Sequence, residues 1–142
     1  MGYSWFVLAL LSAIAAAFVT IFGKIGLKDV DANTATAIRA VIMALFLVII
    51  ILAQGKISKI PEIINNKAIY YILLSGIAVA LSWLFYFMAL KMGNASQVAV
   101  IDRLSIVFIL ILSTLFLGEK LDLKSIAGVI LVAVGAILIA LK

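Results

Sequence analysis

The sequence contains no cysteine and no histidine, a single proline, and few charged residues. Charged side chains make up 12% of the 142 residues, whereas hydrophobic ones make up 68%. Ordinary soluble domains have about 25% charged and roughly 45 to 50% apolar residues. No soluble fold of this length buries so much apolar surface. The composition therefore indicates an integral membrane protein that is in contact with the lipid bilayer.

The missing residue types also exclude several kinds of chemistry. Without Cys there is no disulfide or thiolate, and without His the commonest metal ligand and the commonest general base are absent. Only one carboxylate lies deep in an apolar run, so the paired-aspartate mechanism of a membrane enzyme fails on count. The net charge of +5 comes from loop lysines and two arginines within apolar runs. We predict no enzyme activity, metal, cofactor or nucleic-acid partner.

Apolar runs separated by short polar segments divide the chain into membrane spans. A helix needs about 20 residues to cross a bilayer, and each run is close to this length. The five predicted spans cover residues 4–23, 33–53, 68–90, 95–117 and 124–141. We therefore predict an all-α, polytopic bundle of five transmembrane helices, forming a single domain over residues 1–142. The only proline lies outside these spans, so nothing predicts a proline-broken helix within the membrane.

The longest connection between spans, residues 54–67, has two open interpretations. It has four isoleucines opposite three charged residues, and Pro61 is placed where a helix can begin. These features fit a short helix on the membrane surface. A plain polar loop fits equally well. In the turn before the last span, Asp122 or Ser125 is placed to start the helix.

Small residues recur at helical spacing in the first and last spans. Such stripes let helix backbones approach closely in lipid, and they form helix contacts more often than ligand sites. The predicted packing residues are Ala9, Ala13, Ala16, Thr20 and Gly23 in the first span, and Gly128, Gly135, Ala136 and Ala140 in the last.

Five spans place the two chain ends on opposite sides of the membrane, but charge hardly favours either orientation. Lys56, Lys59, Lys67, Lys120 and Lys124 lie on the N-terminal side, and Lys24, Lys28, Lys91 and Lys142 lie on the other. Orientation follows the excess of Lys and Arg in short loops. The near tie predicts either a weak preference for an inside N-terminus or insertion both ways. Insertion both ways permits an antiparallel homodimer that mimics two inverted repeats.

Charged residues inside the spans form a predicted layer at one depth. Arg39 in the second span and Asp102 in the fourth both lie roughly 10 Å below the surface opposite the N-terminus. Arg103 follows Asp102 but points about 100° away around the helix, so Arg39 is the better partner for Asp102. The other members are Lys24 at the end of the first span, and Ser82, Trp83 and Tyr86 in the third.

This layer has more positive than negative charge, which an anionic ligand would complement. Two structural alternatives remain. Arg39 and Arg103 are long enough to extend to the lipid headgroups, although Asp102 is too short to do so. Trp83 and Tyr86 equally fit an aromatic belt at the membrane interface.

Several segments together carry a family resemblance. They are Ala35-Thr36-Ala37-Ile38-Arg39, Ser82-Trp83-Leu84-Phe85-Tyr86, Ala89-Leu90-Lys91-Met92-Gly93, Ile101-Asp102-Arg103-Leu104-Ser105, Leu117-Gly118-Glu119-Lys120 and Gly135-Ala136-Ile137-Leu138-Ile139. In this order and spacing, the sequence resembles the drug/metabolite transporter superfamily over essentially the whole chain. Within that superfamily it is similar to the EamA-type domain in its short, five-span form, which occurs in bacteria and archaea.

The resemblance implies transport of small metabolites by alternating access, with this chain as one half of an inverted-repeat transporter. We predict a multi-pass protein of the prokaryotic plasma membrane. As a homodimer it would carry small organic solutes, carboxylate-bearing ones among them. Two alternatives are efflux of cationic compounds, as in small multidrug exporters, and a non-transporting scaffold or accessory subunit. The positive excess in the layer argues against cationic substrates.

Overall fold

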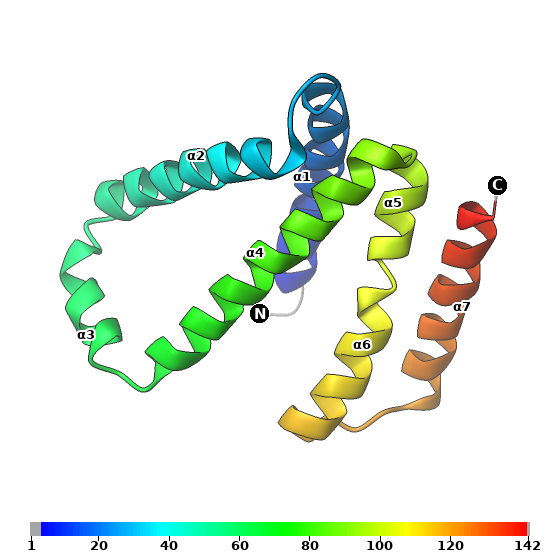
Figure 1. Cartoon of the computed structure of the whole chain (residues 1–142). Helices are drawn as coiled ribbons and strands as arrows, with labels where there is room; N and C mark the ends of the chain where they lie inside the picture. Colours follow the sequence, from blue (N-terminus) through cyan, green and yellow to red (C-terminus); the bar gives the residue numbers. More distant parts are fainter. Residues whose placement is uncertain (1–3, 142) are drawn as a thin grey trace. The chain divides into compact units, whose positions relative to one another are not determined.

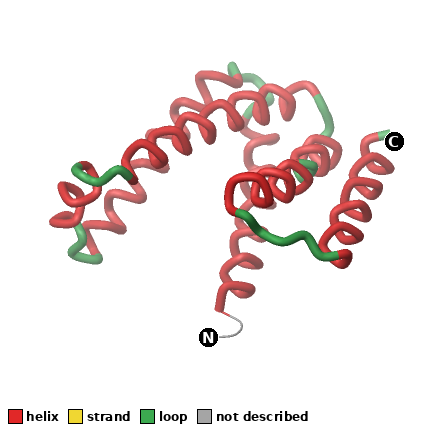
Figure 2. The backbone as a smooth tube through the Cα atoms, turned by 90° about the horizontal axis from the view of Figure 1, so that it is seen from below, coloured by secondary structure: helices red, strands yellow, loops and turns green. Residues whose placement is uncertain are grey.

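The computed structural model describes residues 4–141, which form helices and connecting turns without any strand (Figure 2). In chain order the elements are α1 (Ser4–Gly26), α2 (Ala32–Ala53), a 3-10 turn (Ile57–Lys59), α3 (Ile60–Ile64), α4 (Ala68–Met92), α5 (Ala95–Asp102), α6 (Ser105–Leu112), a π-helical turn (Ser113–Leu117) and α7 (Leu123–Ala140). Within the described residues, five helical segments are long and apolar enough to cross a membrane, with Ala95–Leu117 counted as one. The prediction of an all-α, five-span membrane protein is therefore confirmed.

Two aspartates mark where spanning helices begin. Asp31 precedes α2 and accepts a hydrogen bond of 2.8 Å from the backbone N–H of Thr34. Asp122 precedes α7 and accepts one of 2.9 Å from the N–H of Ser125. The hydrogen bonds from Thr34 lower the pKa of Asp31, and those from Ser125 lower the pKa of Asp122. Each carboxylate satisfies a backbone donor that the first helical turn leaves free.

The chain divides into two compact units, of which one covers Ile25–Lys91. In this unit α2 leads into α3, where the chain reverses, and α4 returns (Figure 1). Residues Ile57–Ile64 are helical, first as the 3-10 turn and then as α3 with Pro61 in its first turn. Its position on the membrane surface stays a prediction. Lys91, near the end of α4, donates a hydrogen bond of 2.6 Å to the carbonyl of Val30.

The other unit contains α1 up to Lys24 and the chain from Met92 onward. Here α7 lies beside both α5 and α6 (Figure 1). Two side chains connect separate parts of this unit. Lys24 Nζ donates a hydrogen bond of 2.7 Å to the carbonyl of Gly93, and Gln97 Nε2 donates one of 3.3 Å to the carbonyl of Ala140. Both carbonyls lie at or just beyond helix ends, where intrahelical donors run out.

The fourth span is not one continuous α-helix, although nothing in the sequence predicted a break there. α5 ends at Asp102, Arg103 and Leu104 form a turn, and α6 begins at Ser105. The backbone bonds across this turn join residues three apart, including Leu104 N–H to Ile101 O at 2.9 Å. No glycine or proline lies at this point. The sequence therefore has, at this point, neither of the residue types that most often interrupt a helix.

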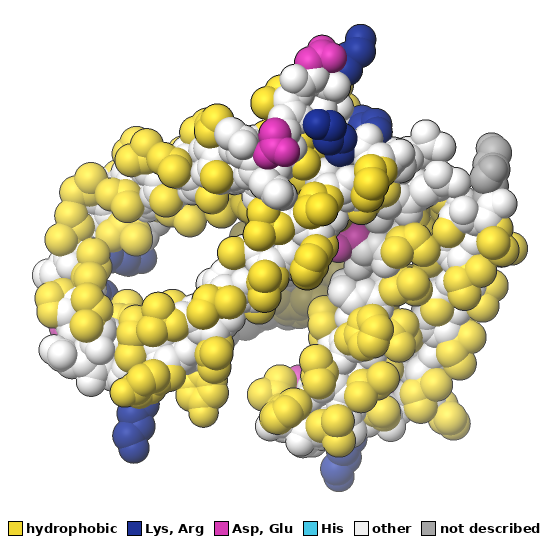
Figure 3. All heavy atoms as spheres, viewed as in Figure 1, with side chains coloured by type: hydrophobic (Ala, Val, Ile, Leu, Met, Phe, Trp, Pro, Cys, Tyr) yellow, Lys and Arg dark blue, Asp and Glu magenta, His cyan; other side chains and the backbone are white. Residues whose placement is uncertain are grey.

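Apolar side chains cover the visible sides of the helices, and most charged side chains lie near the turns (Figure 3). Large hydrophobic residues are exposed along every span, for example Phe46 on α2 at 60% and Phe108 on α6 at 64%. In water such a surface would be strongly destabilising, so these helices contact lipid. Of the predicted packing stripes, Thr20 and Ala136 are buried, whereas Ala9, Ala13 and Gly128 are exposed. The helix contacts that the stripes predict stay a prediction.

Candidate functional site

Arg39 lies on α2 and is held against aromatic rings of α4. It is the eighth residue of the helix, so its backbone is about 10 Å from the start of the span. Its Cζ atom lies 3.3 Å from the ring centroid of Phe87 and 4.8 Å from that of Trp83. The aromatic rings hold the guanidinium within the unit formed by residues 25–91.

The spacing of the two aromatic residues explains how α4 builds this contact. Trp83 and Phe87 are four residues apart, so their side chains lie on one face of the helix, one above the other. Phe87 is only 2% exposed, and the ring of Tyr86 meets it edge-on at a centroid distance of 5.2 Å. A cation over a desolvated aromatic face is stabilised by about 2 kcal/mol. The rings therefore provide part of the interaction that Arg39 loses by leaving water.

The aromatic rings provide no strong hydrogen-bond acceptor for the Arg39 guanidinium. The Nε and Nη2 atoms of Arg39 are buried, and neither has a hydrogen-bond partner among residues 4–141. A buried donor left unpaired is costly, and more so when it carries charge. Arg39 thus combines a positive charge, an aromatic support and two unused donors within one membrane span.

Asp102 and Arg103 lie at the interruption of the fourth span. Asp102 is the last residue of α5 and Arg103 is the first of the turn, so both charges sit where the regular helix stops. Both side chains are exposed on this chain, and within the described residues no ion pair joins them. Lys24 belongs to the same compact unit and to the same predicted layer. Its Nζ donates a hydrogen bond to the carbonyl of Gly93.

The predicted layer draws its residues from both compact units. Arg39, Ser82, Trp83 and Tyr86 belong to residues 25–91, while Lys24, Asp102 and Arg103 belong to the other unit. The structure brings Arg39 and Trp83 together, whereas Ser82 is exposed and makes no hydrogen bond to either of them within residues 4–141. The layer as a whole, including a pairing of Arg39 with Asp102, stays a prediction.

Phe87 is the residue that the sequence analysis missed. It was not among the predicted site residues, yet its ring makes the shorter contact with Arg39. The available signal was its position four residues after Trp83, which places both rings on the face of α4 that could receive a side chain from α2.

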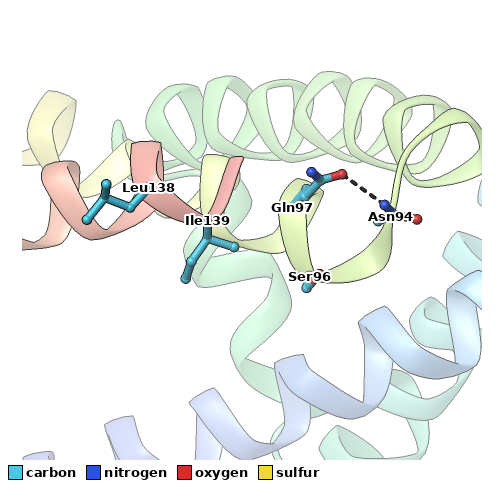
Figure 4. Close-up of a pocket in the computed structure, with 5 residues that line it drawn as sticks. All are labelled: Asn94, Ser96, Gln97, Leu138 and Ile139. Carbon is cyan, nitrogen blue, oxygen red and sulfur yellow. Dashed lines mark hydrogen bonds between the residues drawn. The ribbon is translucent and has the colours of Figure 1, made fainter. Parts of the chain in front are cut away.

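A separate recess of about 520 Å³ lies where the start of α5 meets the end of α7 (Figure 4). Its lining consists of Asn94, Ser96, Gln97, Leu138 and Ile139. Asn94 Nδ2 donates a hydrogen bond of 3.1 Å to Gln97 Oε1, and the Asn94 side chain does not cap the α5 backbone. Among the described residues, no cluster of three or more Asp or Glu side chains could hold a metal ion.

Comparison with known proteins shows the family of the chain. The sequence matches the EamA-like transporter family over residues 3–141. The chain belongs to this family. An EamA-like chain with apolar helices of spanning length is a multi-pass membrane transporter, which makes Arg39 a charge inside a transport protein.

Two relatives match this EamA-like transporter over nearly its full length. A Sinorhizobium sp. protein described as "Uncharacterized transporter in cobO 3'region" is 44% identical over 140 residues, which cover 99% of both chains. An uncharacterised protein of Methanocaldococcus jannaschii is 28% identical over 136 residues, 96% of both chains. No solved structure matches.

Proposed function

We propose that this EamA-like protein is a secondary transporter that moves small organic metabolites, carboxylate-bearing ones among them, across the plasma membrane of a prokaryotic cell. Arg39 is the observation that carries the proposal. A guanidinium supported by Trp83 and Phe87 within a span, with two donors lacking acceptors in the described chain, is suited to an anionic solute. Ionisable residues at membrane depth typically mark substrate or ion pathways.

The wider charge pattern supports the same class of substrate. Lys24, Arg39 and Arg103 supply three positive charges to the predicted layer, and Asp102 supplies one negative charge. In this proposal the cations attract the anion, and Asp102 acts as an ion-pair switch or proton carrier. The sequence has no GxxxxGK[ST] phosphate-binding loop, so an ion gradient rather than a nucleotide would drive transport.

We further propose that the transporter works as a homodimer by alternating access. Transporters commonly place the substrate site between two inverted repeats near the middle of the membrane. A chain with five spans is the size of one such repeat, and two copies inserted in opposite directions would provide both. The nearly balanced lysines on the two sides support insertion in both directions.

Transport in reconstituted vesicles tests this function. Uptake and efflux of labelled small carboxylates are measured for the wild type and for the variants Asp102→Asn, Arg39→Gln and Lys59→Gln. Lys59 lies in the segment between α2 and α3 and is exposed, so its variant is the matched control. We expect the first two variants to lose at least about tenfold in rate, because each removes a charge that a site in lipid holds at considerable cost. Wild-type rates in well-folded Asp102→Asn and Arg39→Gln proteins would remove the charged layer from the mechanism.

A further inference from the structure

The two unpaired donors of Arg39 lie on the same edge of its guanidinium. Nε carries one N–H, and Nη2 carries an N–H that points in the same direction, so the edge presents two parallel donors. This arrangement matches the two oxygens of one carboxylate, which can accept both hydrogen bonds at once. The atoms left without partners are therefore a geometric pair rather than two unrelated donors.

The faces and the edge of the guanidinium have different surroundings. The ring centroid of Phe87 lies 3.3 Å from Arg39 Cζ and that of Trp83 lies 4.8 Å from it. Aromatic carbon therefore lies next to the plane of the guanidinium. Rings attract a cation but accept no strong hydrogen bond, which leaves the edge as the place for a polar partner. Because the rings exclude water, a charge-assisted hydrogen bond at this edge is stronger than one in solvent.

The ring contact also places the guanidinium along the length of α4. Phe87 lies five residues before the end of α4 at Met92, which is about 8 Å along the helix. An arginine that extended to the headgroups would direct its guanidinium past the end of the helix. Here the guanidinium is instead held beside a ring within the span.

We propose that the Nε–Nη2 edge of Arg39 binds one carboxylate group of the transported solute, with Phe87 and Trp83 as its aromatic support. This inference rests on the proposed transport function and names its binding residue. A lipid phosphate shares the chemistry of two oxygens on one centre, so the test includes a phosphonate alongside carboxylates.

Because the chain contains two arginines, NMR can observe the Nε–H group of Arg39 directly. Full-length protein labelled with ¹⁵N-arginine in detergent micelles gives Nε–H signals from Arg39 and Arg103 alone, and the Arg103→Lys variant assigns them. We expect acetate and benzoate to shift the Arg39 signal in a saturable way, because its Nε–H gains a charged acceptor. Acetamide, benzamide and sodium chloride at equal concentration should leave it in place. An Arg39 signal that no carboxylate moves would overturn the proposal.

A second measurement compares variants by thermal unfolding in the same micelles. Ligand binding raises the apparent melting temperature by mass action. Arg39→Lys keeps the charge but loses the two-donor edge, so it should need at least about tenfold more benzoate for the same shift. Arg103→Lys should respond like the wild type. Equal stabilisation by benzoate in Arg39→Lys would overturn the edge as the binding group, and so would methylphosphonate acting on the wild type as strongly as acetate.

These results separate the binding site from the function. Binding at Arg39 without any carboxylate transport in vesicles would contradict the transport function while leaving the site in place. Carboxylate transport at the wild-type rate by Arg39→Lys would support the function and reject the site.

Discussion

The Cζ atom of Arg39 lies 3.3 Å from the centre of the Phe87 ring, so a charged residue of α2 and an aromatic residue of α4 form one contact inside the membrane span. Phe87 is among the most buried side chains of the described chain, at 2% exposure. A charge and a ring that depend on each other should not behave as independent residues when they are replaced.

A double-mutant cycle measures that dependence. We expect Arg39→Met and Phe87→Leu, alone and combined, to show a favourable coupling of about 1 to 2 kcal/mol in the free energy of unfolding. Chemical unfolding in mixed micelles provides the measurement. The control cycle combines Arg39→Met with Phe85→Leu, because Phe85 is on the same helix but is 67% exposed. Purely additive effects in the Arg39 and Phe87 cycle would contradict a direct interaction.

Lys24 stabilises the unit that contains α1 and α5. Its bond of 2.7 Å to the Gly93 carbonyl satisfies an acceptor in the turn that follows α4. We expect Lys24→Met to lower the free energy of unfolding by about 1 kcal/mol, a typical value for a polar contact between membrane helices. Lys28→Met is the matched control, because Lys28 is exposed in the turn after α1. If both variants lose the same stability, the bond to Gly93 contributes nothing specific.

The two capping aspartates predict a pH dependence. Hydrogen bonds from Thr34 and Ser125 lower the pKa of Asp31 and Asp122 in the folded protein. A lowered pKa stabilises the fold fully above the unfolded pKa of about 3.9, and this contribution is lost as the pH falls through the folded value. We therefore expect the melting temperature to fall as the pH decreases below about 4.

The double variant Asp31→Asn/Asp122→Asn separates this effect from the other acids. Asparagine still accepts the capping hydrogen bond but does not titrate in this range. We expect the wild type to exceed the variant in stability at pH 7 and to lose that advantage at low pH. Parallel melting curves across the whole pH range would show that the two carboxylates do not contribute to the acid loss.

Insertion in both orientations predicts a specific labelling pattern. Single cysteines at Ser58 and Asp29 lie in turns at opposite ends of α2, in a background without cysteine. If the chain inserts both ways, an impermeant thiol reagent applied to intact cells should label a fraction of each variant. Labelling of one site to completion and of the other not at all would establish a single orientation.

Much of the architecture follows from local sequence. Apolar runs of spanning length predicted the spanning helices, because the backbone in lipid must satisfy its own hydrogen bonds. Asp122 or Ser125 was predicted to start the last span, and Asp122 is the residue whose side chain caps α7. These features depend on residues close together in the chain, so sequence patterns suffice to find them.

The features that depend on distant residues were harder to predict. Trp83 was a candidate site residue, but the choice of Phe87 as the nearer support of Arg39 depends on how α2 meets α4. The interruption after Asp102 has neither proline nor glycine to announce it. The contact of Arg39 is decided by how two elements meet, which propensity and periodicity do not describe. For the interruption after Asp102 neither the sequence nor the contacts of the structure give a reason.

The turn at Arg103 and Leu104 gives the fourth span separate helical segments, although both turn residues keep right-handed helical backbone angles. Hydrogen bonds between residues three apart wind this stretch more tightly, at about 3.0 residues per turn instead of 3.6. Tighter winding rotates the face that α6 presents relative to that of α5. The side chains after Asp102 therefore face directions that a regular helix through the same sequence would not give them.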